Sequence, residues 1–159
     1  MEFYDWLLAL HVLAAFSLVA ALVLYSTVIA LSWNLAVPSD VVRLFRITRI
    51  GDAAIVVGSI GTLVLGIWLA IDSDEYQVWD GWVIAALVLW AVSMATGGKT
   101  GNVYNATRDR ARALVAEGRD VADSELSAMV RSSSGLALHA ATVVLVVALL
   151  VVMIYKPGA

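Results

Sequence analysis

Residues 7–31 read LLALHVLAAFSLVAALVLYSTVIAL, and this stretch decides the fold. It contains no Asp, Glu, Lys or Arg, and it is long enough to cross the roughly 30 Å hydrocarbon core of a membrane at about 1.5 Å per helical residue. A backbone in lipid must satisfy its own hydrogen bonds, and the stretch lacks the period-two alternation of a barrel strand. We therefore expect a membrane-spanning helix here.

Three further runs without a charged side chain follow, at residues 53–71, 81–98 and 132–155, and every charged residue lies outside the four runs. The 159 residues are 62% hydrophobic and 14% charged, whereas about 25% of the residues in a soluble domain are charged. The sequence predicts an all-α integral membrane four-helix bundle, up-down-up-down, in one membrane domain over residues 1–159. The expected spans are 7–31, 53–71, 82–98 and 135–155, with a cytoplasmic helical link at 99–131.

The link between the third and fourth spans is expected to hold two short helices. The run Gly97-Gly98-Lys99-Thr100-Gly101 is interpreted as the end of the third span. The predicted landmarks that follow are a cap at Asn105 or Thr107, a helix through Arg108–Glu117, an interruption at Gly118 and a second helix at Ser124–Val130.

Basic residues predict the orientation. Nine of the ten Lys and Arg residues fall in the two links that precede the second and fourth spans, and only Lys156 falls on the other side. The loop between the second and third spans is acidic, with Asp72, Asp74, Glu75 and Asp80. Because cytoplasmic loops carry the excess of basic residues, we expect both termini outside a bacterial cytoplasmic membrane. The first run has an acidic flank, so we expect a retained span rather than a cleaved signal.

Composition and motifs argue against several classes of function. The chain has no cysteine and a net charge of −3, which excludes disulfides and gives no electrostatic footprint for nucleic acid. No acidic residue falls in a predicted span, so a Ser-His-acid set or a carboxylate relay is not expected. Arg49 and Asp52 are interpreted as a local ion pair and helix N-cap. A non-enzymatic protein is favoured.

Two histidines, His11 and His139, lie within predicted spans, where ionisable residues are functional candidates. Their depths differ by roughly 15 Å at about 1.5 Å per residue, which disfavours a single haem between them. For His139 we expect a hydrogen bond to Tyr25 or Ser26, with Thr142 nearby. His139 is therefore the weaker candidate for a cofactor contact.

His11 is the stronger candidate for a cofactor contact. At its depth the other spans offer Gly66, Ala86 or Leu87, and Leu150, none with a polar side chain. Gly66 would leave room beside the imidazole for haem b or a quinone, and His11 would be a metal ligand only if haem is bound. The alternative is a histidine hydrated from the outer surface or hydrogen-bonded to the Leu7 carbonyl.

Small residues predict where the helices pack. Ala54, Gly58, Thr62 and Gly66 recur every fourth residue along the second span. Helices in lipid associate through small residues that let their backbones approach, so this face is expected to contact another helix.

The opening run Trp6-Leu7-Leu8-Ala9-Leu10-His11-Val12-Leu13-Ala14-Ala15 resembles the first span of small bacterial membrane proteins. CopD-like copper-resistance proteins and HemJ-like protoporphyrinogen oxidases are among them, and the whole chain looks most like a bacterial four-helix integral-membrane family of unknown function. The resemblance to HemJ-like proteins implies haem binding by His11. Those proteins also carry a Pro-Arg pair where this chain has Leu24–Val28, so the resemblance implies architecture rather than oxidase activity.

Together these observations predict a non-catalytic accessory or scaffold module. Its partners would be the lipid bilayer and other membrane-protein subunits or further copies of itself, and not nucleic acid. The alternative is a redox membrane protein that binds haem b or a quinone near His11. A transporter is the least favoured reading, because no span contains a proline and no inverted repeat is visible.

Overall fold

The structure, a computed structural model, describes residues 3–73 and 77–158. It is 84% helical, with no strand in the described part of the chain, which confirms the predicted all-α class. The helices are α1 (Phe3–Ser32), α2 (Pro38–Phe45), α3 (Thr48–Asp72), α4 (Gly81–Ala116), α5 (Ser124–Val130) and α6 (Ser133–Tyr155). The segments that contain α1, α3, α4 and α6 are long and apolar enough to cross a membrane.

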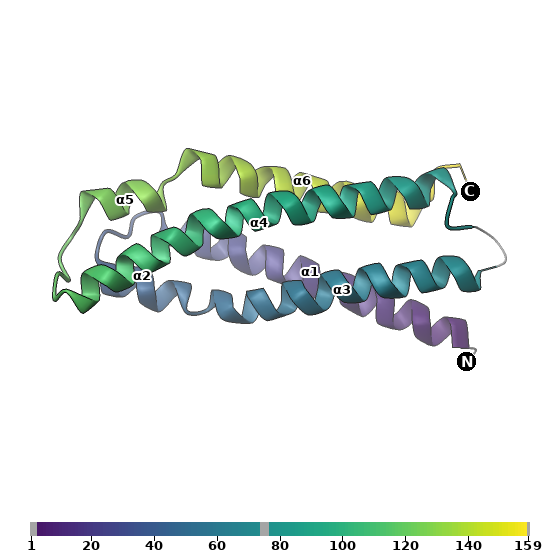
Figure 1. Ribbon diagram of the computed structural model, residues 1–159, viewed down its shortest axis with the longest axis horizontal. Helices are drawn as coiled ribbons and strands as arrows, with labels where there is room; N and C mark the ends of the chain where they lie inside the picture. The colour runs from purple at the N-terminus through teal and green to yellow at the C-terminus, as the bar shows by residue number, and fades with distance from the viewer. Residues whose placement is uncertain (1–2, 74–76, 159) are drawn as a thin grey trace.

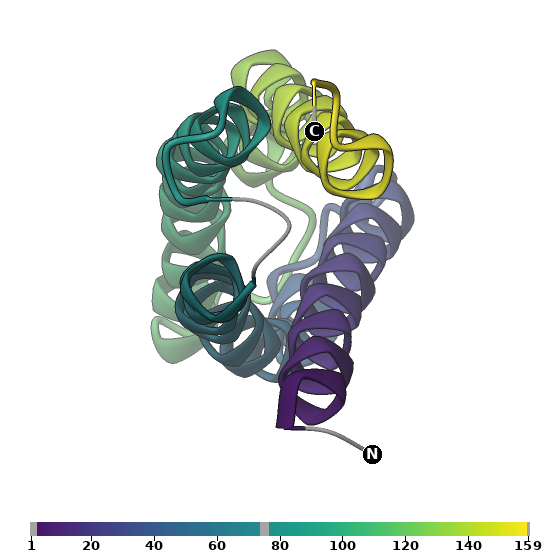
Figure 2. The same cartoon turned by 90° about the vertical axis from the view of Figure 1, so that its right-hand side faces the viewer.

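The four long helices form two pairs. Helix α1 packs along α3 and α4 packs along α6, whereas α1 and α6, and likewise α3 and α4, touch at few points. Seen end on, the four helices surround a common axis (Figure 2). Both chain ends lie at one end of the molecule, called the terminal end below, and α2 and α5 lie at the opposite, link end (Figure 1).

Glycines in α3 bring its backbone close to α1. A Cβ atom placed on Gly58 would lie 2.9 Å from both the carbonyl oxygen of Ala14 and the backbone nitrogen of Leu18. A Cβ on Gly61 would lie 2.9 Å from the Cβ of Ala14. Gly58 and Thr62 are buried. The predicted small-residue face of α3 is therefore confirmed as a close helix contact, of the kind that lipid-embedded helices use.

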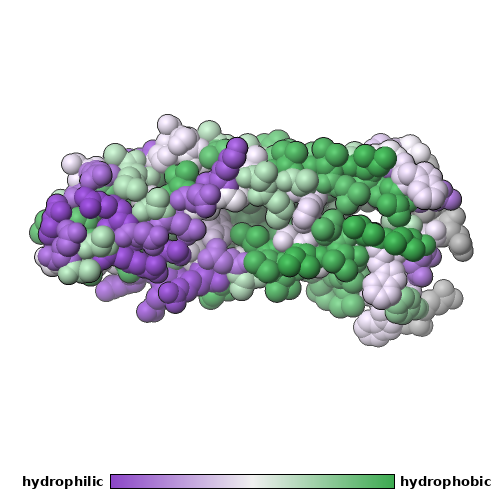
Figure 3. Space-filling view, in the orientation of Figure 1, coloured by the Kyte–Doolittle hydropathy of each residue, from purple (hydrophilic) through white to green (hydrophobic). Residues whose placement is uncertain are grey.

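Apolar and polar surfaces are separated along the length of the molecule. Apolar side chains cover the long helices toward the terminal end, and hydrophilic ones gather at the link end (Figure 3). Large apolar side chains such as Phe16, Val57 and Val144 are about two-thirds exposed. Soluble monomers rarely expose apolar patches of more than a few hundred Å², so this surface needs a covering other than water.

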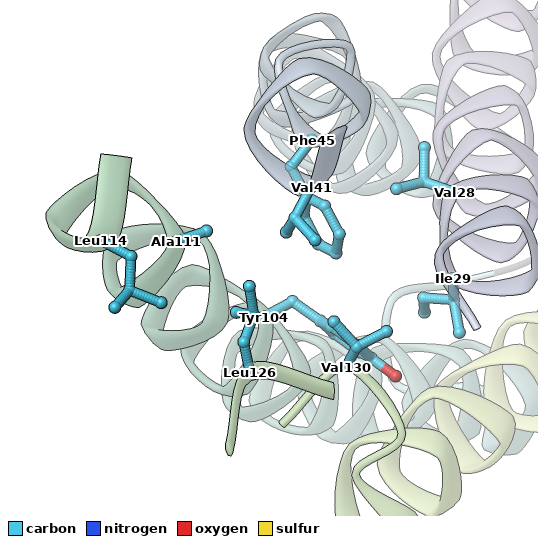
Figure 4. Packing of buried hydrophobic residues seen from close by; sticks show 9 residues of the cluster. All are labelled: Val28, Ile29, Val41, Phe45, Tyr104, Ala111, Leu114, Leu126 and Val130. Atoms are coloured by element: carbon cyan, nitrogen blue, oxygen red, sulfur yellow. The ribbon is translucent and has the colours of Figure 1, made fainter. Parts of the chain in front are cut away.

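A compact core closes the link end. Val41 of α2, Leu114 of α4 and Leu126 of α5 are completely buried (Figure 4). The cluster consists of Val28, Ile29, Val41, Phe45, Tyr104, Ala111, Leu114, Leu126 and Val130. It joins α1 and α2 to α4 and α5, so the two helix pairs are tied together at this end.

The helix boundaries differ from the sequence prediction in the third link. Helix α4 continues through Gly97 and Gly98 to Ala116, so the helix does not end at the predicted end of the third span. Glycine is about 1 kcal/mol less favourable than alanine inside a helix, but it keeps its backbone N–H donor, so the helical hydrogen bonds continue through both glycines. Thr107 caps nothing, because its hydroxyl donates to the Val103 carbonyl within the helix at 3.1 Å.

The rest of that link agrees with prediction. Gly118 has a positive φ of 72°, follows the last turn of α4 and ends it, and α5 covers the expected second helix. Helix α2 was not expected, although Pro38 at its first position and Asp40 in its first turn are typical start signals. Asp74 and Glu75 of the predicted acidic loop lie outside the described residues.

Candidate functional site

His11 lies directly against the backbone of α3. A Cβ on Gly66 would be 2.9 Å from Cε1 of the imidazole and 3.3 Å from Nδ1. The absence of a side chain on Gly66 thus makes space for the imidazole ring, in agreement with the predicted common depth of the two residues. Any larger residue at position 66 would require the ring to move.

A cavity of about 530 Å³ adjoins His11 in the terminal-end half of the bundle, and it is called the terminal-end cavity below. All four long helices contribute to its wall. Gly66, Ala86, Leu87 and Leu150, the residues expected at the depth of His11, all line it. The wall is mostly apolar, with Trp82 and Trp90 among its aromatic members.

Two polar atoms in this wall are buried and, among the described residues, have no hydrogen-bond partner: Nδ1 of His11 and the hydroxyl of Thr62. The imidazole also interacts with the backbone of Thr62, one turn before Gly66. A buried polar group left unpaired costs about 1–3 kcal/mol. Thr62 is a polar neighbour that the sequence prediction did not place beside His11.

His139 is held by a different environment. Its Nε2 lies 2.8 Å from Oγ of Ser26, so the expected hydrogen bond to α1 is confirmed. The Ser26 hydroxyl donates to the Leu22 carbonyl at 2.9 Å. A hydroxyl has one hydrogen, so the imidazole must donate to Ser26, which places a hydrogen on Nε2. Thr142, one turn along α6, donates to the hydroxyl of Thr96 at 3.1 Å.

The two histidines do not share a site. His11 lines the terminal-end cavity, and His139 lines a second cavity nearer the link end. The fifteen residues from His11 to Ser26, the partner of His139, correspond to about 22 Å of α-helix. One iron needs imidazole nitrogens about 2 Å away on each side. The geometry therefore disfavours a haem held by both residues.

The second cavity, called the link-end cavity below, has a volume of about 350 Å³. Tyr25 of α1 and Asp52 of α3 line it, and the Tyr25 hydroxyl donates to Oδ1 of Asp52. Asn102 and Asn105 of α4 line it as well. This polar group was not predicted as a site.

Asp52 has a different role from the one expected. Helix α3 begins at Thr48, with Ile47 at the N-cap position, so Asp52 lies in the second turn and is not a cap. Arg49 forms no ion pair among the described residues, and Asp52 bonds to Tyr25 instead. The expectation of an Arg49–Asp52 pair with Asp52 as the N-cap is wrong, because the helix starts about one turn earlier than the charge-free run.

Searches of family models, curated proteins and solved structures found no match for this chain. Among the described residues there is also no group of three or more His, Asp or Glu side chains that could hold a metal ion. The function must therefore be argued from the two cavities themselves.

Proposed function

We propose that this chain is inserted in the bacterial cytoplasmic membrane as an up-down-up-down bundle with both termini outside. The apolar covering of the long helices supports insertion. The hydrophilic link end, where α2 and α5 lie, is then cytoplasmic, in agreement with the basic links. The terminal-end cavity would lie in the outer half of the bilayer.

The function that the geometry supports best is the binding of a lipophilic molecule with a small polar head. One observation carries this proposal: Nδ1 of His11 and the hydroxyl of Thr62 are both buried, both unpaired among the described residues, and both beside the same apolar cavity. Ligand sites are typically apolar cavities with a few convergent polar groups. A ligand that hydrogen-bonds to these two atoms would remove the cost of leaving them unpaired.

A quinone has the matching chemistry. Its ring carbonyls accept hydrogen bonds from a hydroxyl and from an imidazole N–H, and its tail would extend along the apolar wall. Entry from the bilayer suits a cavity whose wall is almost entirely hydrocarbon and aromatic. The proposed quinone contacts are His11 and Thr62, with Gly66 providing the space for the ring of His11.

Haem b is the second candidate, favoured by the unpaired imidazole nitrogen in a cavity of about 530 Å³. Either nitrogen of a neutral imidazole can ligate a metal, so His11 would hold the haem iron. The residues fit a haem with a single histidine ligand. His139 would not take part, because it lines the other cavity and is bonded to Ser26.

The test is ligand binding by the purified protein in non-ionic detergent. A short-chain benzoquinone should quench the fluorescence of Trp82 and Trp90, which line the cavity. We expect His11→Ala and Thr62→Val to weaken this quenching, and His139→Ala, remote from the cavity, to leave it unchanged. An absorption band of bound haem that is lost in His11→Ala would favour the second candidate. Saturation by neither ligand would overturn the binding proposal and favour the accessory or scaffold role.

A further inference from the structure

The link-end cavity has one wall on α4 that leaves unfilled space. A Cβ placed on Gly98 or on Gly101 would meet no atom within 4 Å. Asn102 and Asn105, one turn apart on the same helix, also line the cavity. Both asparagines are exposed, and neither side chain forms a hydrogen bond with another described residue, so their amide oxygens are available as acceptors.

The opposite wall belongs to α1 and α3 and supplies a carboxylate. Oδ1 of Asp52 accepts the hydrogen bond from Tyr25, and Oδ2 has no hydrogen-bond partner in the described chain. A carboxylate that accepts a hydrogen bond from a phenol still has further lone pairs available as acceptors. Asp52, Asn102 and Asn105 together present oxygen acceptors from two helices to one space.

The charged residues at the cavity indicate which charge a ligand should carry. The titratable residues in the wall are Tyr25, Asp52 and His139, and none of the lining residues is Lys or Arg. Arg108, one turn beyond Asn105, lies 3.8 Å from Asp109 and does not line the cavity, although its charge acts on Tyr25. Asp52 is therefore the one acidic side chain among the lining residues.

We propose that the link-end cavity binds a small organic ammonium ion. An ammonium group brings a positive charge for Asp52 and several N–H donors for Asn102 and Asn105, so each free acceptor finds a donor. A bare Ca²⁺ ion needs six to eight oxygen ligands, and one carboxylate with two amides supplies too few. The cavity of about 350 Å³ has room for the organic part of the ligand.

Isothermal titration of the intact protein in non-ionic detergent, at pH 7 and fixed ionic strength, tests this with two probes. Methylammonium carries the charge and N–H donors, whereas tetramethylammonium carries the charge alone. We expect saturable binding of methylammonium and little binding of tetramethylammonium. No saturable heat with methylammonium, or equal binding of both ions, would overturn the proposal.

Two pairs of variants locate the site. Asp52→Asn should weaken methylammonium binding about tenfold or more, since one hydrogen bond to a charged group contributes this much. Asp72→Asn, on the same helix at the terminal end, is the control. Gly101→Leu should block binding by filling the space, whereas Gly81→Leu, also open at its Cβ but outside the cavity, should not. Unchanged binding in folded Asp52→Asn and Gly101→Leu, each with a wild-type melting temperature, would contradict the assignment.

Discussion

Oγ of Ser26 on α1 lies 2.8 Å from Nε2 of His139 on α6, and this hydrogen bond joins the two helix pairs of the bundle. A second cross-pair bond runs from the indole N–H of Trp90 on α4 to the Ser59 carbonyl on α3, at 3.3 Å. A small buried cluster of Ala70 on α3 with Trp82 and Val83 on α4 also joins the pairs at the terminal end. Few other contacts connect them along the apolar half of the molecule, so these bonds and this cluster have a large share in fixing their separation.

The Ser26–His139 bond should be measurable in a double-mutant cycle. His139→Ala leaves the Ser26 oxygen unpaired in a part-buried place, so the free energy of unfolding in detergent should fall by about 1–3 kcal/mol. The double variant with Ser26→Ala should cost less than the sum of the single variants, by about 0.5–3 kcal/mol. Additive effects would show that the two side chains do not interact.

Replacement of Gly58 should separate α1 from α3. Leucine at this position would place its Cβ 2.9 Å from backbone atoms of α1, which cannot move aside as a side chain can. We expect Gly58→Leu to lower the melting temperature strongly. Val64→Leu, on the exposed face of the same helix, is the control and should melt like the wild type. Equal melting of both variants would contradict the assigned face.

The link-end core should respond like the core of a soluble protein. Leu114 is completely buried, so Leu114→Ala should cost about 2–5 kcal/mol through lost burial and an unfilled cavity. Val115, the next residue, is 40% exposed, and Val115→Ala should have a much smaller effect. Chemical denaturation followed by circular dichroism measures both.

Replacement of Gly66 should weaken ligand binding more than replacement of Gly61 does. Alanine at either position would place a Cβ 2.9 Å from an atom of α1, but at Gly66 that atom belongs to the ring of His11. We expect Gly66→Ala to displace the imidazole and to weaken quenching by the benzoquinone. Gly61→Ala, whose clash is with Ala14 outside the cavity, is the matched control. Equal quenching in the two variants would show that His11 does not contact the ligand.

Cysteine labelling tests the proposed orientation, and the absence of native cysteine makes each introduced thiol specific. A membrane-impermeant maleimide should label Gln77→Cys in intact cells. It should label Arg112→Cys only after the membrane is opened, because α4 extends into the cytoplasm in the proposed orientation. The reverse pattern would place the termini inside.

Much of the fold could be predicted because long apolar helices can be recognised by the absence of charged side chains. The charge-free runs gave each long helix within a few residues at most ends, and the spacing of Gly58, Thr62 and Gly66 identified the contact face. The extent of α4 could not be predicted, since a helix that leaves the apolar layer need not end there. Its continuation to Ala116 depends on packing against α2 and α5.

The site was predictable only in part, for a related reason. Helical rise alone predicted that His11 lies at the depth of Gly66 and that His139 lies near Tyr25 or Ser26, and the structure selects Ser26. Asp52 was misread because a charge next to an apolar run is typical of a helix start. Its partner Tyr25 is 27 positions earlier in the chain, and only the crossing of α1 and α3 brings the two together.

The two-pair arrangement has a mechanical consequence. The link-end core joins the pairs at one end, and a smaller buried cluster of Ala70 on α3 with Trp82 and Val83 on α4 joins them at the other. The same three residues line the terminal-end cavity, so the wall of the cavity includes a contact between the two pairs. In a bilayer, the lateral pressure of the acyl chains would act on the helices that form this wall. The width of the cavity, and with it the affinity for a ligand, would then depend on the thickness and composition of the surrounding lipid.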